Sequence, residues 1–142
     1  MEPFLPRPQI ERRTGDEPFR FGDRRLDVRL VDFWRWAFSD VITNTTRGVL
    51  AEFVVASALG IEMVLRDPWA EHDLVTPDGL RIEVKSSSYV QSWSQRRPSR
   101  IAFSIRDARP RDESGGAYLD RLERHSDFYV FALLAEQDRS RF

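Results

Sequence analysis

The feature that most constrains the fold of this 142-residue chain is the tripeptide Pro77-Asp78-Gly79, which separates two segments of alternating apolar and polar residues. Alternation with a period of two is typical of β-strands, and residues 72–76 and 80–86 both show it. With the proline and aspartate at the centre of a type I turn and the glycine at positive φ, Thr76 and Leu80 close the loop. The sequence therefore predicts a β-hairpin of defined register.

That register places charged residues together. Counted back from the turn, it pairs 75 with 81, 74 with 82, and Asp73 with Glu83. Because side chains alternate along a strand, Lys85 lies on the same side as Glu83. The opposite face is apolar, and a slip of one residue would bury the charges. Its residues are Leu74, Leu80, Ile82 and Val84.

Two facing carboxylates have Cβ atoms about 4.5–5.5 Å apart and repel each other. Lys85 supplies one compensating charge, and a divalent cation would supply more. The alternative is a solvated charge cluster on the outer face of a hairpin. The chain has no cysteine and only two histidines, His72 and His125, so a thiolate or histidine zinc site is excluded. A metal site here would consist of oxygen ligands, which suits Mg²⁺, Mn²⁺ or Ca²⁺.

Lys85 is the only lysine among 22 basic residues, the other 21 being arginine. The composition favours arginine wherever any positive charge suffices. A single retained lysine indicates a site that needs a compact ammonium group with a tunable pKa.

Glu52 is the second unusual charge. It lies in a predicted helix that is capped by Thr45 or Thr46 and ends at Gly60. Between residues 48 and 58 only Glu52 and Ser57 have polar side chains. An ionised carboxylate in an apolar helix costs several kcal/mol, on the order of what a buried charge costs, unless it is paired or binds a metal. An ion pair with Arg47, or a capping role, is the alternative.

In the rest of the chain, the spacing of apolar residues predicts the helices and strands. The predicted order is helix, helix, three strands, short helix, strand, which indicates an α/β or α+β fold with a mixed central sheet flanked by helices. Residues 1–25 are predicted to be an extended or poorly ordered arm, and 26–142 a single domain whose abrupt end indicates a truncation. The other predicted elements are a helix over 26–39, a strand over 100–106, a short helix over 117–124 and a central buried strand over 127–134.

The pattern of Glu52 in an apolar helix, then Asp73, then Glu83-Val84-Lys85 resembles the PD-(D/E)xK nuclease superfamily, which has the restriction-endonuclease-like fold. The resemblance implies a core order αβββαβ, here with an extra N-terminal helix. It implies that Asp73 and Glu83 bind Mg²⁺, with Mn²⁺ as a substitute, and that the Val84 backbone carbonyl completes the protein ligands. Lys85 would position or deprotonate the attacking water, and Glu52 would hold a metal or its water. His72 stands where the superfamily often has proline.

The expected function is metal-dependent hydrolysis of nucleic-acid phosphodiester bonds, with DNA favoured over RNA. The alternative is a catalytically inactive nuclease-fold module that binds nucleic acid or a protein partner. Six arginines and one acid lie between residues 95 and 111, which fits phosphate contacts or, equally, a solvated surface. Trp93 could stack on a base or pack in the core. The predicted substrate-binding residues are Ser86, Gln91, Arg96, Arg97 and Arg100.

No apolar run approaches the roughly 18–20 residues of a membrane helix, and the N-terminus lacks the apolar core of a signal peptide. The sequence predicts a cytoplasmic protein without membrane contact. Many members of the superfamily act as dimers, so a homodimer is one expected state.

Overall fold

The structure, a computed structural model, describes residues 8–62, 64–105 and 124–142. The chain forms two compact units, Met1–Ser39 with Val64–Arg66, and Asp40–Met63 with Asp67–Phe142. The prediction of a single domain over residues 26–142 stays a prediction.

The first unit is a β-hairpin followed by a helix. Strands β1 (Pro18–Phe21) and β2 (Arg24–Arg29) pair antiparallel, and α1 (Leu30–Phe38) follows directly. The predicted helix start at residue 26 is therefore wrong. Leu26 and Val28 also alternate with charged residues, so this segment fits a strand period as well as a helix period. Pairing with β1 selects the strand.

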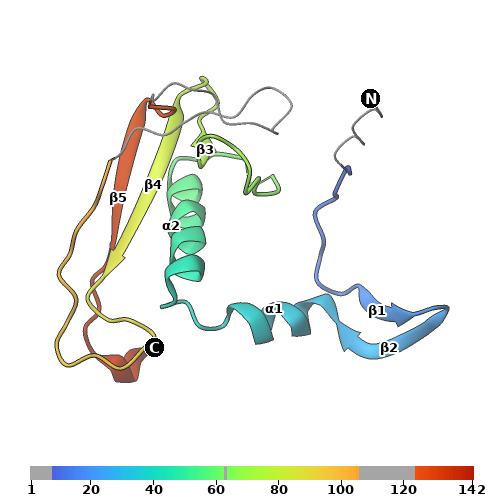
Figure 1. The fold of residues 1–142 in the computed structure, drawn as a ribbon. Coiled ribbons are helices and arrows are strands. Elements are labelled where there is room, and N and C mark those ends of the chain that lie inside the picture. The colour runs from blue at the N-terminus through green and yellow to red at the C-terminus, as the bar shows by residue number, and fades with distance from the viewer. Residues whose placement is uncertain (1–7, 63, 106–123) are drawn as a thin grey trace, which may run out of the picture. The chain divides into compact units, whose positions relative to one another are not determined.

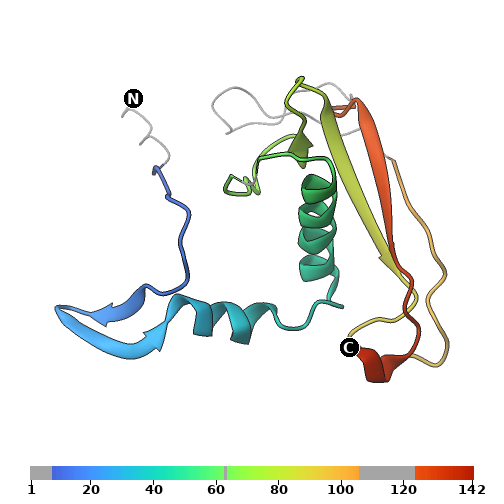
Figure 2. The ribbon, with the colours of Figure 1, turned by 180° about the vertical axis from the view of Figure 1, so that it is seen from behind.

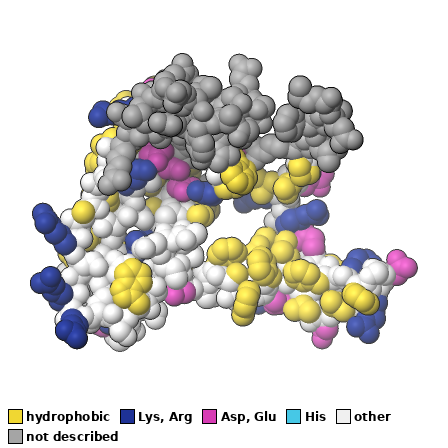
Figure 3. All heavy atoms as spheres, in the orientation of Figure 1, with side chains coloured by type: hydrophobic (Ala, Val, Ile, Leu, Met, Phe, Trp, Pro, Cys, Tyr) yellow, Lys and Arg dark blue, Asp and Glu magenta, His cyan; other side chains and the backbone are white. Residues whose placement is uncertain are grey.

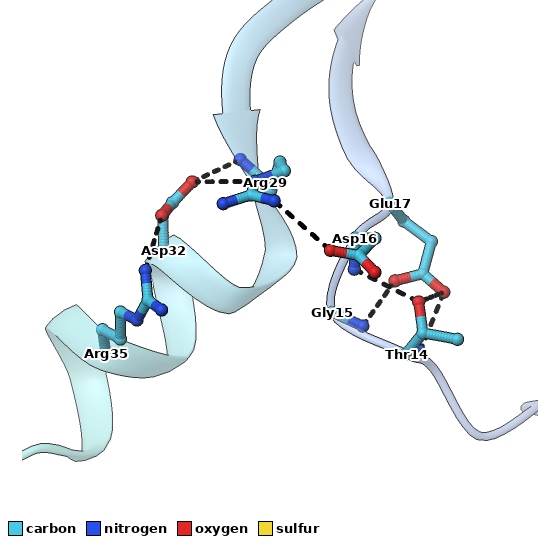
Figure 4. A network of polar contacts seen from close by, with 7 residues as sticks. All are labelled: Thr14, Gly15, Asp16, Glu17, Arg29, Asp32 and Arg35. Atoms are coloured by element: carbon cyan, nitrogen blue, oxygen red, sulfur yellow. Dashed lines mark hydrogen bonds and ion pairs between the residues drawn. The ribbon is translucent and has the colours of Figure 1, made fainter.

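Polar contacts define where α1 begins (Figure 4). The Arg29 backbone N–H donates to Asp32 Oδ2 over 2.8 Å, which is the half of a capping box that the third helical residue supplies at the helix N-terminus. The Arg29 side chain pairs with Asp16 over 3.3 Å, and Asp32 pairs with Arg35 over 3.6 Å. The start of α1 is thus set by local hydrogen bonds, and none of its residues is buried.

The second unit contains a three-stranded mixed sheet in the order β3-β4-β5 (Figure 1). Strand β4 (Arg81–Ser88) lies between β3 (Leu74–Val75), which is antiparallel to it, and β5 (Phe128–Leu134), which is parallel. A mixed sheet was predicted, and it is confirmed. A central, buried position for the last strand is wrong, because β5 lies at an edge of this sheet and its residues are half-buried or exposed. A short 3₁₀ helix, η1 (Arg139–Arg141), follows β5.

Helix α2 (Asn44–Ala58) packs along β4, as both ribbon views show (Figures 1 and 2). Its N-cap is Thr43, whose hydroxyl oxygen accepts from the Thr46 backbone N–H, so the predicted cap at residue 45 or 46 is wrong. The predicted stop is confirmed, because Gly60 takes φ 64°. Among the described residues, the buried apolar ones are Ala56, Ile82, Val84 and Val90, and most of them belong to α2 and β4.

The turn between β3 and β4 has the predicted form. The Gly79 N–H donates to the Thr76 carbonyl, and the Thr76 N–H donates to the Leu80 carbonyl, both over 2.9 Å. Gly79 takes φ 87°, and Leu74 pairs with Ile82. The register predicted from the turn is confirmed over these residues, although β3 is shorter than the predicted strand.

One predicted strand is absent, and one predicted helix falls outside the described residues. Residues 101–105 form no strand, so that part of the predicted order αβββαβ is wrong over the described segment. Instead the chain there lies against β5, with the Phe103 and Phe131 ring centroids 4.7 Å apart. The predicted helix over 117–124 falls almost wholly outside the described residues. The described fold is of the α+β class, and no helix in it is long and apolar enough to cross a membrane.

Candidate active site

Asp73 is held by the backbone of β4 on both sides of Glu83. The Asp73 backbone N–H donates to the Ile82 carbonyl over 3.1 Å. The Val84 backbone N–H in turn donates to Asp73 Oδ2 over 2.7 Å. The carboxylate therefore has a fixed place at the end of the hairpin, next to the residue that the register predicts opposite it.

Glu83 and Lys85 form an ion pair between Oε1 and Nζ. They alternate with Ile82 and Val84, which are buried, as the two-residue period of β4 requires. The side chains of Glu83 and Lys85 remain 23 % and 35 % exposed, so both have access to solvent. The predicted separation into a charged and an apolar face is confirmed at these four positions.

Glu52 enters from α2 and is only 8 % exposed. Its charge acts on Asp73, as do those of Glu83 and Lys85. The pKa of Asp73 is raised, first by burial and then by the negative charges of Glu83 and Glu52. The hydrogen bond from the Val84 N–H and the charge of Lys85 act in the opposite direction. The four residues singled out in the sequence thus form one electrostatic cluster, which we call the acidic cluster.

The chemistry of the acidic cluster suits a hard divalent cation, because all its potential ligands are oxygen atoms. Within residues 8–62, 64–105 and 124–142, no group of three or more His, Asp or Glu side chains has the arrangement of a metal site. A cation held here would need backbone or water ligands besides Asp73 and Glu83. Burial raises the pKa of Asp73 most, and the negative charges of Glu83 and Glu52, which raise it further, are what such a cation would offset.

The predicted substrate-binding residues divide into two groups. Ser86 is half-buried on β4, and Arg96, Arg97 and Arg100 are exposed in the segment after it. Gln91 is buried, with only 8 % exposed. Its side-chain amide donates to the Ser88 carbonyl over 3.0 Å and to Ser99 Oγ over 3.2 Å. The side chain of Gln91 is therefore engaged in hydrogen bonds inside the protein.

Arg47 is a buried cation that the sequence suggested only as a partner for Glu52. One Nη donates to the Ile42 carbonyl over 2.8 Å and lies 3.5 Å from Gln91 Oε1, and the other donates to Asn44 Oδ1 over 2.7 Å. Burial lowers its pKa. These contacts link the start of α2 to the segment after β4. This linking role of Arg47 could have been inferred from the sequence, because an arginine near the start of an otherwise apolar helix needs polar partners.

Comparison with known proteins matches the sequence of this chain to a family. The sequence model of the family described as bacteriophage T4 endonuclease IV matches residues 35–142. The match includes all residues of the acidic cluster and the arginines that follow β4. No curated protein and no solved structure matches the chain. Because the family match spans well over half of the sequence, the chain belongs to the bacteriophage T4 endonuclease IV family, a family of nucleases.

Proposed function

We propose that this protein is a metal-dependent nuclease that hydrolyses phosphodiester bonds in DNA, with a site of the PD-(D/E)xK type. The observation that supports this most is the acidic cluster. At one end of a hairpin, the charges of Glu83, Glu52 and Lys85 all act on the carboxyl group of Asp73. The chain also belongs to an endonuclease family. A cluster of like charges around one half-buried carboxyl is costly for stability, which favours a functional role.

The ligands proposed for Mg²⁺, or Mn²⁺ in its place, are Asp73, Glu83 and the Val84 backbone carbonyl. Glu52 would contribute directly or through a water. When bound, the cation would polarise the scissile phosphate and lower the pKa of a water molecule. In the metal-free protein the hydrogen bond from the Val84 N–H already orients the Asp73 carboxylate, which favours binding of the cation.

Lys85 is the residue proposed to act on the attacking water, by aligning it or by removing its proton. Its partner Glu83 holds the ammonium group close to the carboxylates. A lysine suits this role better than an arginine, because its pKa shifts readily and its single nitrogen presents a compact donor. The partial exposure of both side chains leaves room for solvent and substrate.

The decisive experiment measures cleavage of plasmid, single-stranded DNA and RNA with Mg²⁺ or Mn²⁺. The parent protein should cut DNA, and EDTA should abolish the activity. Lys85→Ala should lose at least about 100-fold in rate, the lower end of what general acid–base catalysis contributes. Lys85→Arg, which keeps the charge, should not recover the parent rate. Circular dichroism should show an unchanged fold.

A Lys85→Ala protein that cuts DNA at the parent rate would refute the catalytic assignment. Isothermal titration with Mn²⁺ separates the inactive-module alternative from the nuclease. Heat that disappears in Asp73→Ala supports the metal site. An absence of both heat and cleavage would favour a module that only binds.

A further inference from the structure

The segment after β4 has an unusual charge pattern. Between Ser86 and Ile105 there are three arginines and no acidic residue, in a chain whose net charge is −1. Arg96, Arg97 and Arg100 are all exposed. Among the residues that the structure describes, no acidic side chain forms an ion pair with any of the three. Their charges are therefore available to a partner in solution.

The segment that carries these arginines is held in place by hydrogen bonds between its own residues. The Ser99 N–H donates to the Tyr89 carbonyl, and the Gln91 N–H donates to Gln95 Oε1, each over 2.8 Å. The Gln95 amide donates to Ser99 Oγ over 2.9 Å. The buried Gln91 side chain anchors the same segment to Ser88. A segment held in this way loses less conformational entropy when it binds a partner than a free loop does.

A fourth arginine joins the segment from the C-terminal end of the chain. Arg139, in η1, donates from Nη2 to Gln95 Oε1. The neighbouring Arg141 is paired with Glu136 over 2.7 Å, and Asp138 accepts from the Ser140 N–H over 2.9 Å. Figure 3 shows Lys and Arg side chains projecting along the lower left edge, where the ribbon of Figure 1 has the segment that follows β4.

We propose that Arg96, Arg97, Arg100 and Arg139 form a second nucleic-acid contact, the distal arginine surface, which binds backbone phosphates away from the scissile bond. The proposal rests on the proposed function, because it takes DNA as the substrate. Arginine forks match phosphate oxygens in a bidentate geometry. A surface of this kind contacts only phosphates, so it adds affinity without reading base sequence.

The position of the distal arginine surface along β4 suggests which phosphates it contacts. From Glu83 to Ser88 the strand advances by about 17 Å, at roughly 3.3–3.4 Å per residue. That length corresponds to about five steps of one DNA strand, at about 3.4 Å each. The arginines that follow Ser88 would thus contact the substrate at least that far from the bond that is cut.

The test measures binding of the full chain to a long fluorescein-labelled duplex by anisotropy, in EDTA, between about 50 and 200 mM salt. The test variant is R96Q/R97Q/R100Q. The matched control is R20Q/R24Q/R25Q, which removes the same charge from exposed positions on β1 and β2. Thermal denaturation verifies that both variants fold.

The slope of log Kd against log salt should fall by about 2.7 in the test variant, or about 0.9 for each lost phosphate contact. Arg139→Gln alone should lower it by about 0.9. The control should bind as the parent does. A parent-like slope in the test variant would overturn the proposal, as would an equal loss in the control, because net charge alone would then explain the effect.

The outcomes separate this proposal from the nuclease assignment. If the parent protein binds DNA through these arginines but never cuts it, the distal arginine surface stands and the proposed function fails. If cleavage depends on Lys85 while R96Q/R97Q/R100Q binds and cuts like the parent, only the distal arginine surface is refuted. A parent protein that does not bind DNA at all refutes it as well.

Discussion

At the scale of single residues, Asp73 shows the conflict between stability and the proposed chemistry. Its carboxylate is half-buried and lies in the field of two further carboxylates, which together raise its pKa. The charged form of Asp73 is therefore less favourable in the folded protein than in the unfolded chain. This cost is present at neutral pH, and the proposed cation would offset it.

Asp73→Asn should therefore stabilise the metal-free protein. Asparagine keeps an oxygen that can accept from the Val84 N–H, while the repulsion disappears. After a discount for solvent screening, a gain of no more than about 1 kcal/mol is expected, which would raise Tm by about 4 °C in a domain of this size. Thermal denaturation in EDTA measures the gain, and addition of Mn²⁺ should stabilise the parent protein but not the variant.

The stabilisation expected of Asp73→Asn can be checked in two ways: by its dependence on pH, and by a control substitution at Asp78, whose pKa is shifted in the opposite direction. Because the pKa is raised in the folded state, the advantage of the variant should vanish as pH falls to about 4, where the unfolded carboxyl is also protonated. The pKa of Asp78 is lowered instead, chiefly by the hydrogen bond with Thr76. Asp78→Asn should not stabilise the protein at any pH. A stabilising Asp78→Asn would show that net charge, and not the acidic cluster, is responsible.

At the scale of elements, the turn before β4 fixes which residues face each other. Gly79→Ala should cost about 1–2 kcal/mol, because an L-residue at φ 87° places its Cβ too close to the following carbonyl. Outside the glycine and its two chain neighbours, nothing lies within 4 Å of the added Cβ, so the substitution measures the strain of the local backbone.

Gly48 in α2 is the matched control. It too has nothing within 4 Å of an added Cβ, but it lies in a helix. Gly48→Ala should stabilise the protein by about 0.5–1 kcal/mol. Urea denaturation of both variants measures the two effects. Equal effects of the same sign would contradict the assigned backbone conformations.

A second element-scale feature joins the first residue of β4, Arg81, to the residue that precedes β5, Asp127. Arg81 Nη2 lies 2.8 Å from Asp127 Oδ1, and Arg81 Nε donates to Asp127 Oδ2 over 3.1 Å. The Asp127 backbone N–H also donates to the Arg81 carbonyl over 2.8 Å. The bonds from the Arg81 side chain, together with the bond that the Arg81 backbone N–H donates to Asp127 Oδ2 over 2.9 Å, lower the pKa of Asp127 to about 2. They tie together two strands whose pairing residues lie far apart in the sequence.

Asp127→Asn should destabilise the protein at neutral pH. Because the folded pKa is depressed, the contribution of Asp127 is complete above its unfolded pKa of about 3.9 and is lost as pH falls through about 2. The difference between parent and variant in urea denaturation should therefore narrow between pH 4 and pH 2. Glu62→Gln, at an exposed position, serves as the control and should behave as the parent does at every pH. A difference that is constant with pH would argue against the ion pair.

At the scale of the whole molecule, the acidic cluster and the distal arginine surface both belong to the unit Asp40–Met63 with Asp67–Phe142. The family match begins nearby, at residue 35. A fragment of residues 40–142 should therefore retain Mg²⁺-dependent, Lys85-dependent cleavage at a rate within about tenfold of the full chain, a change of about 1.4 kcal/mol in activation free energy. A folded fragment that binds Mn²⁺ but cannot cut would show that the first unit contributes to catalysis.

Local sequence information was enough for the part of the site formed by neighbouring residues. The turn at Pro77-Asp78-Gly79 and the alternation around it predicted the pairing of Leu74 with Ile82, and this is observed. The apolar surroundings of Glu52 predicted its burial in a helix. In both cases a local rule allows one outcome: turn geometry fixes the register of the hairpin, and the cost of a buried charge singles out Glu52.

Tertiary contacts decided the rest. Leu26 fits a strand and a helix equally, and only pairing with β1 resolves the choice. Gln91 resembles a surface residue in the sequence, yet contacts with Ser88 and Ser99 bury it. The edge position of β5 depends on a partner more than forty residues away, Ile82 with Phe128 in the ladder. The sequence by itself determined which residues carry the proposed chemistry and how the hairpin aligns them. The tertiary structure alone decided what surrounds them, because pairing between distant segments leaves no period in the sequence.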